Sequence, residues 1–343
     1  LDNLTRSHLV EGKLAEWIAQ GVTGITSNPT IFHKALMESP YYRDAMAGLR
    51  TAEPDAEKRY ETLVAEDIRA ACDLLKPAYD ASSDDDGYVS LEVAPRFAHD
   101  AGRTVAEAQR LSRLIGRENL LIKVPGTAEG LQAFEQLTAE GLRVNVTLLF
   151  SLRQTVRTFE AYIRGTRRWL ESGGEAARLK AVASLFLSRV DTLVDSRLEG
   201  AQTPGALSLR GKTAVAMARL AYQRYRDMFH GAAFEPLRAA GARPQSLLWA
   251  SSGVKNPAYA DLLYVEPLIG PKTINTLPDK TLAALLDHGR AVPSLDFGVP
   301  EAEAHFVALE SLGLDMDEVG EVLQTDGVRL FAESYEKLIE AVG

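Results

Sequence analysis

The feature that most constrains this chain is a regular alternation of short apolar runs with longer segments of helical periodicity. Between the runs, apolar residues recur at the three- and four-residue spacing of amphipathic helices. Examples are Tyr60, Val64, Ile68, Ala71 and Leu75, and later Val105, Ala108, Leu111 and Ile115. The short runs predict strands at Val22–Ser27, Tyr88–Val93, Leu120–Val124, Val144–Leu149, Val182–Leu187, Leu247–Ser251 and Thr273–Thr276, with a further one at Leu1–Asn3. Such alternation favours a parallel sheet with crossover helices.

Eight strands in this pattern predict an α/β fold, a single (β/α)8 barrel of the TIM type. A doubly wound open sheet is the competing architecture. After Thr276 the pattern is helical only and ends with a long helix from Asp315 to about Val342, so additional helices are expected mostly at the C-terminal side. No boundary divides residues 1–343, which are expected to form one domain. Because the chain begins at Leu1 rather than Met, we expect native residues to precede it.

Composition excludes several classes of function. The net charge is −9, which is unfavourable for binding nucleic acid or an anionic membrane surface, and no apolar run is long enough to span a membrane. The single cysteine, Cys72, forms no intramolecular disulfide and fits a cytoplasmic protein. The histidines lack metal-ligand spacing, and no G-x-G-x-x-G or Walker A loop is present, so neither a metal nor a nucleotide cofactor is expected. The acidic run Ser82–Gly87 is interpreted as a solvated turn.

The predicted strands place polar side chains on one face. Alternate residues of a strand point to opposite faces, and in each of these strands one face is apolar. The other face carries polar or ionisable groups near the carboxyl end, where α/β barrels hold their active sites. These groups are Thr26 and Asn28, Ser90 and Glu92, Lys123, Asn145 and Thr147, and Ser184 with Phe186.

Lys123 is the sharpest candidate for chemistry. It lies within the apolar run NLLIKVPGT, and burial lowers the pKa of a lysine and frees its amine to attack a carbonyl. The alternative is a buried ion pair with Glu92. Glu92 and Thr147, from the strands on either side, are placed to hold one water for proton transfer, or to form a structural hydrogen bond. Asp2 is either a second carboxylate facing the same interior or a surface residue.

A phosphate site is predicted after the late strands. Arg189 follows one strand, and Ser251, Ser252, Gly253 and Lys255 follow the next, which is the usual place of a phosphate cup in this architecture. Arginine binds phosphate in bidentate fashion and lysine offers a point charge. The alternatives are a surface ion pair of Arg189 with Asp191 or Asp195, and a solvated loop lysine at Lys255.

Together these segments resemble the transaldolases. The resemblance covers most of the chain, in the family's order, and is carried by GVTGITSNPTIF (Gly21–Phe32), NLLIKVPGTAEG (Asn119–Gly130), VNVTLLFS (Val144–Ser151), ASLFLSRVD (Ala183–Asp191), LWASSGVKNP (Leu248–Pro257) and KTINTLP (Lys272–Pro278).

The resemblance implies a role for each candidate. It makes Lys123 the Schiff-base nucleophile and Asp2 the acid/base acting on the C4 hydroxyl, and it gives Glu92 and Thr147 the catalytic water. It implies that Asn28, Asn145 and Ser184 bind the dihydroxyacetone hydroxyls, and that Arg189, Ser251 and Lys255 hold the phosphate. Many family members carry arginine where this chain has Lys255, and the loop SSGVKNP differs in length.

The activity implied is that of the pentose phosphate pathway enzyme, which is a transferase. A dihydroxyacetone unit passes from sedoheptulose 7-phosphate to glyceraldehyde 3-phosphate. No cofactor is needed because the protonated imine is the electron sink. Two rivals remain: an aldolase that releases dihydroxyacetone, and a non-catalytic sugar-phosphate-binding barrel. The related fructose-6-phosphate aldolases have a tyrosine at the position that Phe186 occupies in this chain. Phenylalanine there favours transfer of the dihydroxyacetone unit over its release. The oligomeric state, monomer or homodimer, stays open.

Overall fold

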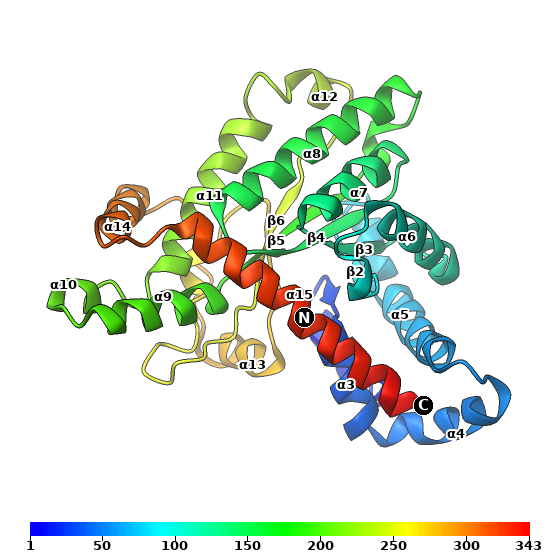
Figure 1. The fold of residues 1–343 in the computed structure, drawn as a ribbon. Helices are drawn as coiled ribbons and strands as arrows, with labels where there is room; N and C mark the ends of the chain where they lie inside the picture. Colours follow the sequence, from blue (N-terminus) through cyan, green and yellow to red (C-terminus); the bar gives the residue numbers. More distant parts are fainter.

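The computed structural model describes residues 1–343 and contains one parallel sheet (Figure 1). Every neighbouring pair of strands is parallel, and the spatial order follows the sequence order without a reversal. A doubly wound sheet requires such a reversal, so that alternative is excluded. The strands are β1 (Ile25–Thr26), β2 (Val89–Glu92), β3 (Leu120–Pro125), β4 (Val144–Leu149), β5 (Ala181–Phe186), β6 (Ser246–Ala250) and β7 (Thr273–Asn275).

The seam between β1 and β7 is bridged by the first two residues. The Leu1 carbonyl accepts a hydrogen bond from Thr26 N at 2.9 Å, and Asp2 N donates to the Leu277 carbonyl at 2.8 Å. The Leu1 backbone nitrogen also donates to the Gly24 carbonyl at 2.8 Å. The strand expected at Leu1–Asn3 is therefore wrong as a regular strand, because too few residues pair. The segment nevertheless occupies the eighth position, and the TIM-type barrel is confirmed.

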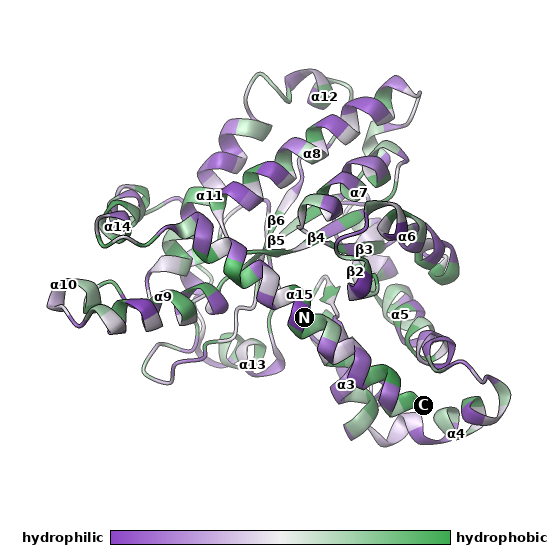
Figure 2. Ribbon diagram, viewed as in Figure 1, coloured by the Kyte–Doolittle hydropathy of each residue, from purple (hydrophilic) through white to green (hydrophobic).

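Amphipathic helices surround the sheet (Figure 1). Figure 2 shows long hydrophilic stretches on α8 and α11 interrupted by hydrophobic residues, as expected for helices with one face on a core. The apolar residues expected at helical spacing lie on α5 and α6 and are buried. The helices are α1 (Arg6–Val10), α2 (Lys13–Ala19), α3 (Pro29–Glu38), α4 (Arg43–Ala52), α5 (Ala56–Ala81), α6 (Ala101–Ile115), α7 (Ala128–Ala139), α8 (Leu152–Glu171), α9 (Ser188–Ala201), α10 (Pro204–Leu207), α11 (Thr213–Phe229), α12 (Glu235–Ala239), α13 (Asp279–His288), α14 (Val299–Ser311) and α15 (Met316–Val342). Short 3-10 turns are η1 (Pro40–Tyr42), η2 (Pro95–Phe97), η3 (Ala176–Arg178) and η4 (Glu266–Leu268).

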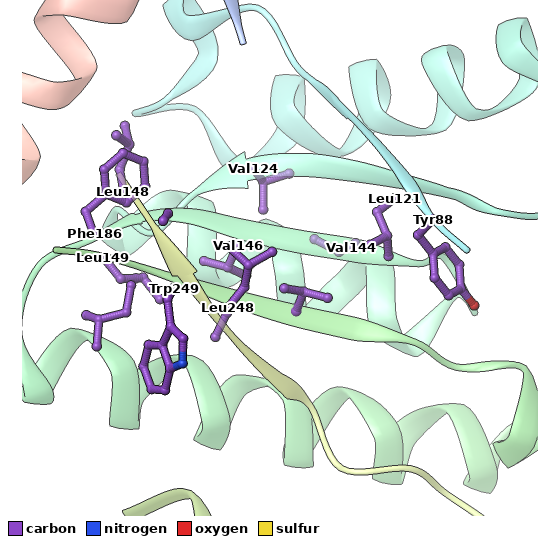
Figure 3. Packing of buried hydrophobic residues seen from close by; sticks show 14 of the residues in the cluster. Tyr88, Leu121, Val124, Val144, Val146, Leu148, Leu149, Phe186, Leu248 and Trp249 are labelled. Carbon is purple, nitrogen blue, oxygen red and sulfur yellow. The ribbon is translucent and has the colours of Figure 1, made fainter. Parts of the chain in front are cut away.

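Both faces of the central strands β3, β4 and β5 are buried. Figure 3 shows strand side chains packed between the sheet and its helices, with Phe186 and Leu148 at one end of the strands and Tyr88 and Leu121 at the other. Trp249 is fully buried, and its indole N–H donates to the Leu268 carbonyl at 3.2 Å. A core on both faces is typical of parallel sheets. Polar groups are therefore expected mainly at the ends of the strands.

The long helix α15, expected from Asp315 onwards, lies over the carboxyl end of the barrel, beside α3 (Figure 1). The Gln324 side-chain amide donates to the carbonyls of Gly126 at 2.9 Å and of Leu148 at 3.0 Å. These carbonyls lie at the carboxyl ends of β3 and β4. Leu148 has a φ of +60°, where the pairing of β4 with β5 shifts register. The helix is therefore tied to the strand ends that carry the candidate site.

The acidic run Ser82–Gly87 forms a turn, but the expectation that it is merely solvated is wrong. The Asp85 carboxylate lies 2.8 Å from Lys180 Nζ and 3.3 Å from Lys272 Nζ. Lys180 is only 3% exposed and directly precedes β5. The turn therefore neutralises a buried cation at the amino end of the barrel, opposite the candidate site.

Close packing of α7 on β3 makes Gly130 a sensitive position. A Cβ on Gly130 would lie 1.9 Å from the Pro125 carbonyl oxygen, so Gly130→Ala is expected to reduce the free energy of unfolding by about 1–3 kcal/mol. The exposed Gly48 of α4 is the control, because a Cβ on Gly48 would meet no atom within 4 Å. Gly48→Ala is expected to stabilise the protein by about 0.5–1 kcal/mol. Chemical denaturation of both variants measures the difference, and equal stabilities would contradict it.

Candidate active site

Lys123 lies in β3 with its side chain toward the barrel interior. The strand register places Glu92 of β2 opposite Lys123 on one side and Asn145 of β4 on the other. The lysine is 4% exposed, and its Nζ donates to the Ser27 carbonyl at 3.1 Å. Its Nζ also lies 3.4 Å from Glu92 Oε2, so the buried ion pair considered from the sequence is present. The same contact gives the amine a neighbour to which it can pass a proton.

Glu92 is a carboxyl group in a water-poor setting. Its side chain is 6% exposed, and burial raises its pKa above the ordinary value. Lys123 lowers that pKa and Asp2 raises it, and the net direction is upward. The hydroxyl of Thr147 is buried without a hydrogen-bond partner, and the oxygen Glu92 Oε2 has no partner besides its ion pair with Lys123. No structural hydrogen bond between strands engages these two atoms, so both can accept a hydrogen bond from a water or a substrate.

A chain of hydrogen bonds crosses the interior beside Lys123. The Ser184 hydroxyl of β5 donates to Asn145 Oδ1 at 2.7 Å, and Asn145 Nδ2 donates to the Ser90 hydroxyl of β2 at 3.2 Å. Asn145 is fully buried and Ser184 is nearly so. The amide orientation is therefore fixed by partners on both sides. Ser90 stands out in the sequence only as a polar residue on the interior face, since its role depends on contacts across three strands.

Asp2 and Asn28 reach the site from the seam of the barrel. Asp2 Oδ1 accepts a hydrogen bond from the Thr26 hydroxyl at 2.7 Å, and that hydroxyl lies 2.6 Å from the hydroxyl of Thr276. Asn28 Oδ1 accepts from Ile31 N at 3.0 Å and so caps α3. Asp2 is therefore an interior carboxylate, and the alternative of a plain surface residue is wrong.

These side chains converge on one cavity of about 180 Å³ at the carboxyl end of the strands. Glu92 and Asn145 lie beneath it, in contact with Lys123 and Ser184. Thr30, Ile31 and Phe331 also line it and were missed in the sequence, because they lie on helices and carry no polar pattern of their own. The sequence-predicted residues that line the cavity are Asp2, Asn28, Lys123, Thr147, Ser184, Phe186, Arg189 and Ser251.

Arg189 is a half-buried cation without an ion-pair partner. Its guanidinium carbon lies 5.7 Å from the ring centre of Phe186 and 5.9 Å from that of Phe331. Burial lowers the pKa of Arg189 from its usual value, with only Asp326 opposing at longer range. Arg189 makes no ion pair, so the alternative of a surface pair with Asp191 or Asp195 is wrong.

The carboxylates of Asp191 and Asp195 instead bind the loop after β6. Asp191 accepts hydrogen bonds from Ala214 N at 2.8 Å and from the Tyr264 hydroxyl at 2.8 Å. Asp195 accepts from Gly211 N at 2.9 Å and from the Tyr259 hydroxyl at 2.7 Å. The two tyrosines thus anchor the loop to α9, and this pairing leaves Arg189 uncompensated.

The predicted phosphate loop is only partly in the cavity. Ser251 directly follows β6 with a φ of +54°, and its hydroxyl lies 2.8 Å from the hydroxyl of Ser188. Lys255, four residues later, is exposed and does not line the cavity. The structure therefore brings Ser251 to Arg189 and leaves Lys255 outside.

Two broader properties of the molecule bear on the site. No cluster of three or more histidine, cysteine, aspartate or glutamate side chains has the arrangement needed to hold a metal ion. None of the helices combines the length and the apolar character needed to cross a lipid bilayer.

Comparison with known proteins agrees with this geometry. A family model described as transaldolase/fructose-6-phosphate aldolase matches residues 1–342. A transaldolase of Thiobacillus denitrificans is 59% identical over 100% of this chain and 96% of its own length. Transaldolases of Thermobifida fusca and Neisseria gonorrhoeae are 47% and 45% identical, over 100% and 99% of this chain and 94% and 95% of their own lengths. An α/β barrel with a buried lysine at its carboxyl end, matched over its whole length in this way, belongs to the transaldolase/fructose-6-phosphate aldolase family.

Proposed function

We propose that this chain is a transaldolase acting through a Schiff base at Lys123. The observation that carries the proposal is the buried amine of Lys123 beside Glu92, in a cavity that is also lined by the unpaired cation Arg189. A nucleophilic amine and an anion receptor in one cavity suit a ketose phosphate. Membership of the family supports sugar phosphates as the class of substrate. We further propose that the donor is sedoheptulose 7-phosphate and the acceptor is glyceraldehyde 3-phosphate.

The first half of the mechanism is carried by Lys123 and Glu92. Glu92 accepts the proton of the Lys123 ammonium, and the neutral amine attacks the C2 carbonyl of the ketose. A water held between Glu92 Oε2 and the Thr147 hydroxyl then relays the proton from Glu92 to the carbinolamine oxygen, which leaves as water. The C–O bond breaks as the C=N bond forms, and the product is a protonated imine on Lys123.

The second half is carried by Asp2. Asp2 removes the proton of the C4 hydroxyl, the C3–C4 bond breaks, and its electron pair passes into the imine to give an enamine. The freed aldehyde leaves, the enamine carbon attacks the aldehyde of the acceptor, and Asp2 returns its proton to the oxygen of that aldehyde, which becomes the new hydroxyl. Hydrolysis through the same water regenerates Lys123. Because the protonated imine accepts the electron pair, the mechanism uses no metal or organic cofactor.

The remaining cavity residues are proposed to orient the sugar. Asn28 and Ser184 line the cavity with Lys123, and Asn145 lies opposite Lys123 in the strand register and accepts a hydrogen bond from Ser184. These three side chains are proposed to bind hydroxyl groups of the dihydroxyacetone unit. Arg189 and Ser251 hold the phosphate. Lys255, which is exposed on the following loop, is assigned only a longer-range attraction for the anion.

An aldolase that releases dihydroxyacetone is the second candidate, and Phe186 decides against it. Its ring lies 5.0 Å from that of Phe150 and 5.7 Å from the Arg189 guanidinium carbon, and it offers no hydroxyl that could orient a hydrolytic water. The test incubates the protein with fructose 6-phosphate and borohydride and maps the adduct by mass spectrometry. Free dihydroxyacetone is assayed with and without erythrose 4-phosphate. An adduct at Lys123 with turnover only in the presence of acceptor is expected, and absence of an adduct would indicate a mere binder.

The organisation around the site is proposed to be a single domain over residues 1–343. One cluster of 81 buried hydrophobic residues runs from Leu1 to Val342, so no part has a separate core.

The single cysteine, Cys72, is buried on α5, and its location is compatible with a reducing cytoplasm, which we propose as the compartment.

Replacing Arg189 with alanine is expected to raise the KM for phosphorylated ketoses about ten- to a hundredfold. A charge-assisted contact is worth about 1.5–3 kcal/mol, and about 1.4 kcal/mol corresponds to a factor of ten. Steady-state kinetics with fructose 6-phosphate and with unphosphorylated fructose measures the effect, which should be much smaller for fructose. Arg197 on the same helix pairs with Glu318 at 3.1 Å away from the cavity, so Arg197→Ala is the matched control. An equal loss for both sugars would show that Arg189 supports the barrel instead.

A further inference from the structure

We propose that Phe331 of α15 is a positioning residue that aims the Arg189 guanidinium at the substrate phosphate. The inference rests on the proposed function, since Arg189 is the proposed phosphate ligand. The guanidinium carbon lies 5.7 Å from the Phe186 ring centre and 5.9 Å from the Phe331 ring centre. All three side chains line the same cavity. One ring comes from the barrel and the other from a helix 142 residues beyond Arg189 in the sequence (331 − 189).

The two rings are the close neighbours that face this guanidinium. Arg189 makes no ion pair and no hydrogen bond within the chain, so its N–H donors remain available. Most arginines elsewhere on the chain take their direction from carboxylates, as Arg110 does from Glu61 and Glu107. A guanidinium over the faces of two aromatic rings is attracted by both without using its donors. The arrangement therefore presents a preorganised fork to an anion that enters the cavity.

The position of the Phe331 ring is itself fixed from both sides along α15. Seven residues earlier, Gln324 donates to the carbonyls of Gly126 and Leu148 at 2.9 and 3.0 Å. Three residues later, the Ser334 hydroxyl accepts from the Thr30 hydroxyl of α3 at 2.9 Å. Gly327, between these points, allows close approach, because a Cβ there would lie 2.9 Å from Leu148 Cδ2. The helix is thus held against the strand ends and α3, and the ring has little freedom to move away from Arg189.

The proposal predicts that the aromatic face, and not merely the bulk, of residue 331 sets the affinity for phosphate. The probe is inorganic phosphate as a competitive inhibitor of turnover with fructose 6-phosphate. Phe331→Leu removes the face and is expected to raise the inhibition constant about three- to tenfold. Phe331→Tyr keeps the face and is expected to restore most of the affinity. Phe331→Met, which offers a flexible apolar side chain without a ring, repeats the first test if the leucine variant folds poorly.

A double-mutant cycle separates action through Arg189 from general support of the fold. In the Arg189→Ala background, Phe331→Leu is expected to change the inhibition constant by less than about twofold, since nothing is left to position. Leu338→Ala, on the same helix but outside the cavity, is the control and should lower Tm without changing phosphate inhibition. Borohydride trapping at Lys123 verifies that each variant retains a folded site.

The outcomes distinguish the role of Phe331 as a positioning residue from the role of Arg189 as the phosphate ligand. If Phe331→Leu weakens phosphate inhibition equally with and without Arg189, Phe331 acts independently and the inference is overturned, whereas the role of Arg189 stands. If Arg189→Ala leaves phosphate inhibition unchanged, the proposed phosphate site is wrong and the inference fails with it. If phosphate inhibits Phe331→Leu and Phe331→Met as strongly as it inhibits the parent, the ring is only packing and the inference is also overturned.

Discussion

Lys123→Ala is expected to abolish the covalent adduct and to lower turnover by several orders of magnitude. The amine is the only group at the floor of the cavity that can form an imine, and removing a nucleophile deletes the whole covalent pathway rather than one contact. The variant should fold, because alanine leaves a cavity but also removes a buried charge. Glu92 then lies without its counter-ion, and its raised pKa allows it to be neutral.

The measurement is mass spectrometry of protein reduced by borohydride in the presence of fructose 6-phosphate. Lys180 offers a matched control, since it is also a buried lysine on the barrel, but its Nζ lies 2.8 Å from Asp85 at the opposite end. Lys180→Met should still give the adduct at Lys123. An adduct that persists in Lys123→Ala and maps to another lysine, such as Lys255, would overturn the assignment.

Glu92→Gln is expected to slow both formation and hydrolysis of the imine by about a hundred- to ten-thousandfold, which is the usual value of general acid–base help. Glutamine keeps the shape and the hydrogen-bonding capacity but accepts no proton. Affinity for the sugar phosphate should be nearly unchanged, since the proposed phosphate ligands are Arg189 and Ser251, which line the cavity, and not Glu92. Single-turnover kinetics of imine formation, compared with KM, separates the two effects.

The pH dependence gives a second check on Glu92. Burial raises the pKa of Glu92, so the rate should fall as the pH drops through that raised pKa and the base becomes protonated. Glu92→Gln should lose this acid limb. For stability the sign is opposite: the folded form binds the proton more tightly, so the stabilisation is present at low pH and is lost as the pH rises through the folded pKa. A permanently neutral glutamine should therefore fold at neutral pH. Full activity in Glu92→Gln would make the carboxylate structural.

The sequence predicted those parts of the site that depend on strand alternation. Lys123, Glu92, Asn145 and Thr147 could be placed on one face because each lies at a fixed step along a strand whose other face is apolar. Arg189 was placed correctly after its strand, but its partners were not. The competing ion pairs failed because Asp191 and Asp195 bind tyrosines from a distant loop.

What the sequence could not predict depends on contacts between distant segments. Phe331 looks like any core residue of an amphipathic helix until α15 is seen over the barrel. The seam at Leu1 and Asp2 closes by single backbone hydrogen bonds, too few for a strand pattern. The exposure of Lys255 follows from a loop whose path is set by Tyr259 and Tyr264, and no local periodicity encodes such a path.

The seam and α15 also affect the order in which the parts of the site form during folding. Strands β2 to β6 pair with their sequence neighbours, so the wall bearing Lys123 can assemble while the chain is still growing. The seam bond between Thr26 and Thr276 joins residues 250 apart, and the bond between Thr30 and Ser334 joins residues 304 apart. Contacts of such separation form slowly and late. During refolding, Lys123 and Arg189, which belong to the early wall, should therefore reach their positions before Asp2 at the seam and Phe331 on α15, and full turnover should be the last property that the protein regains.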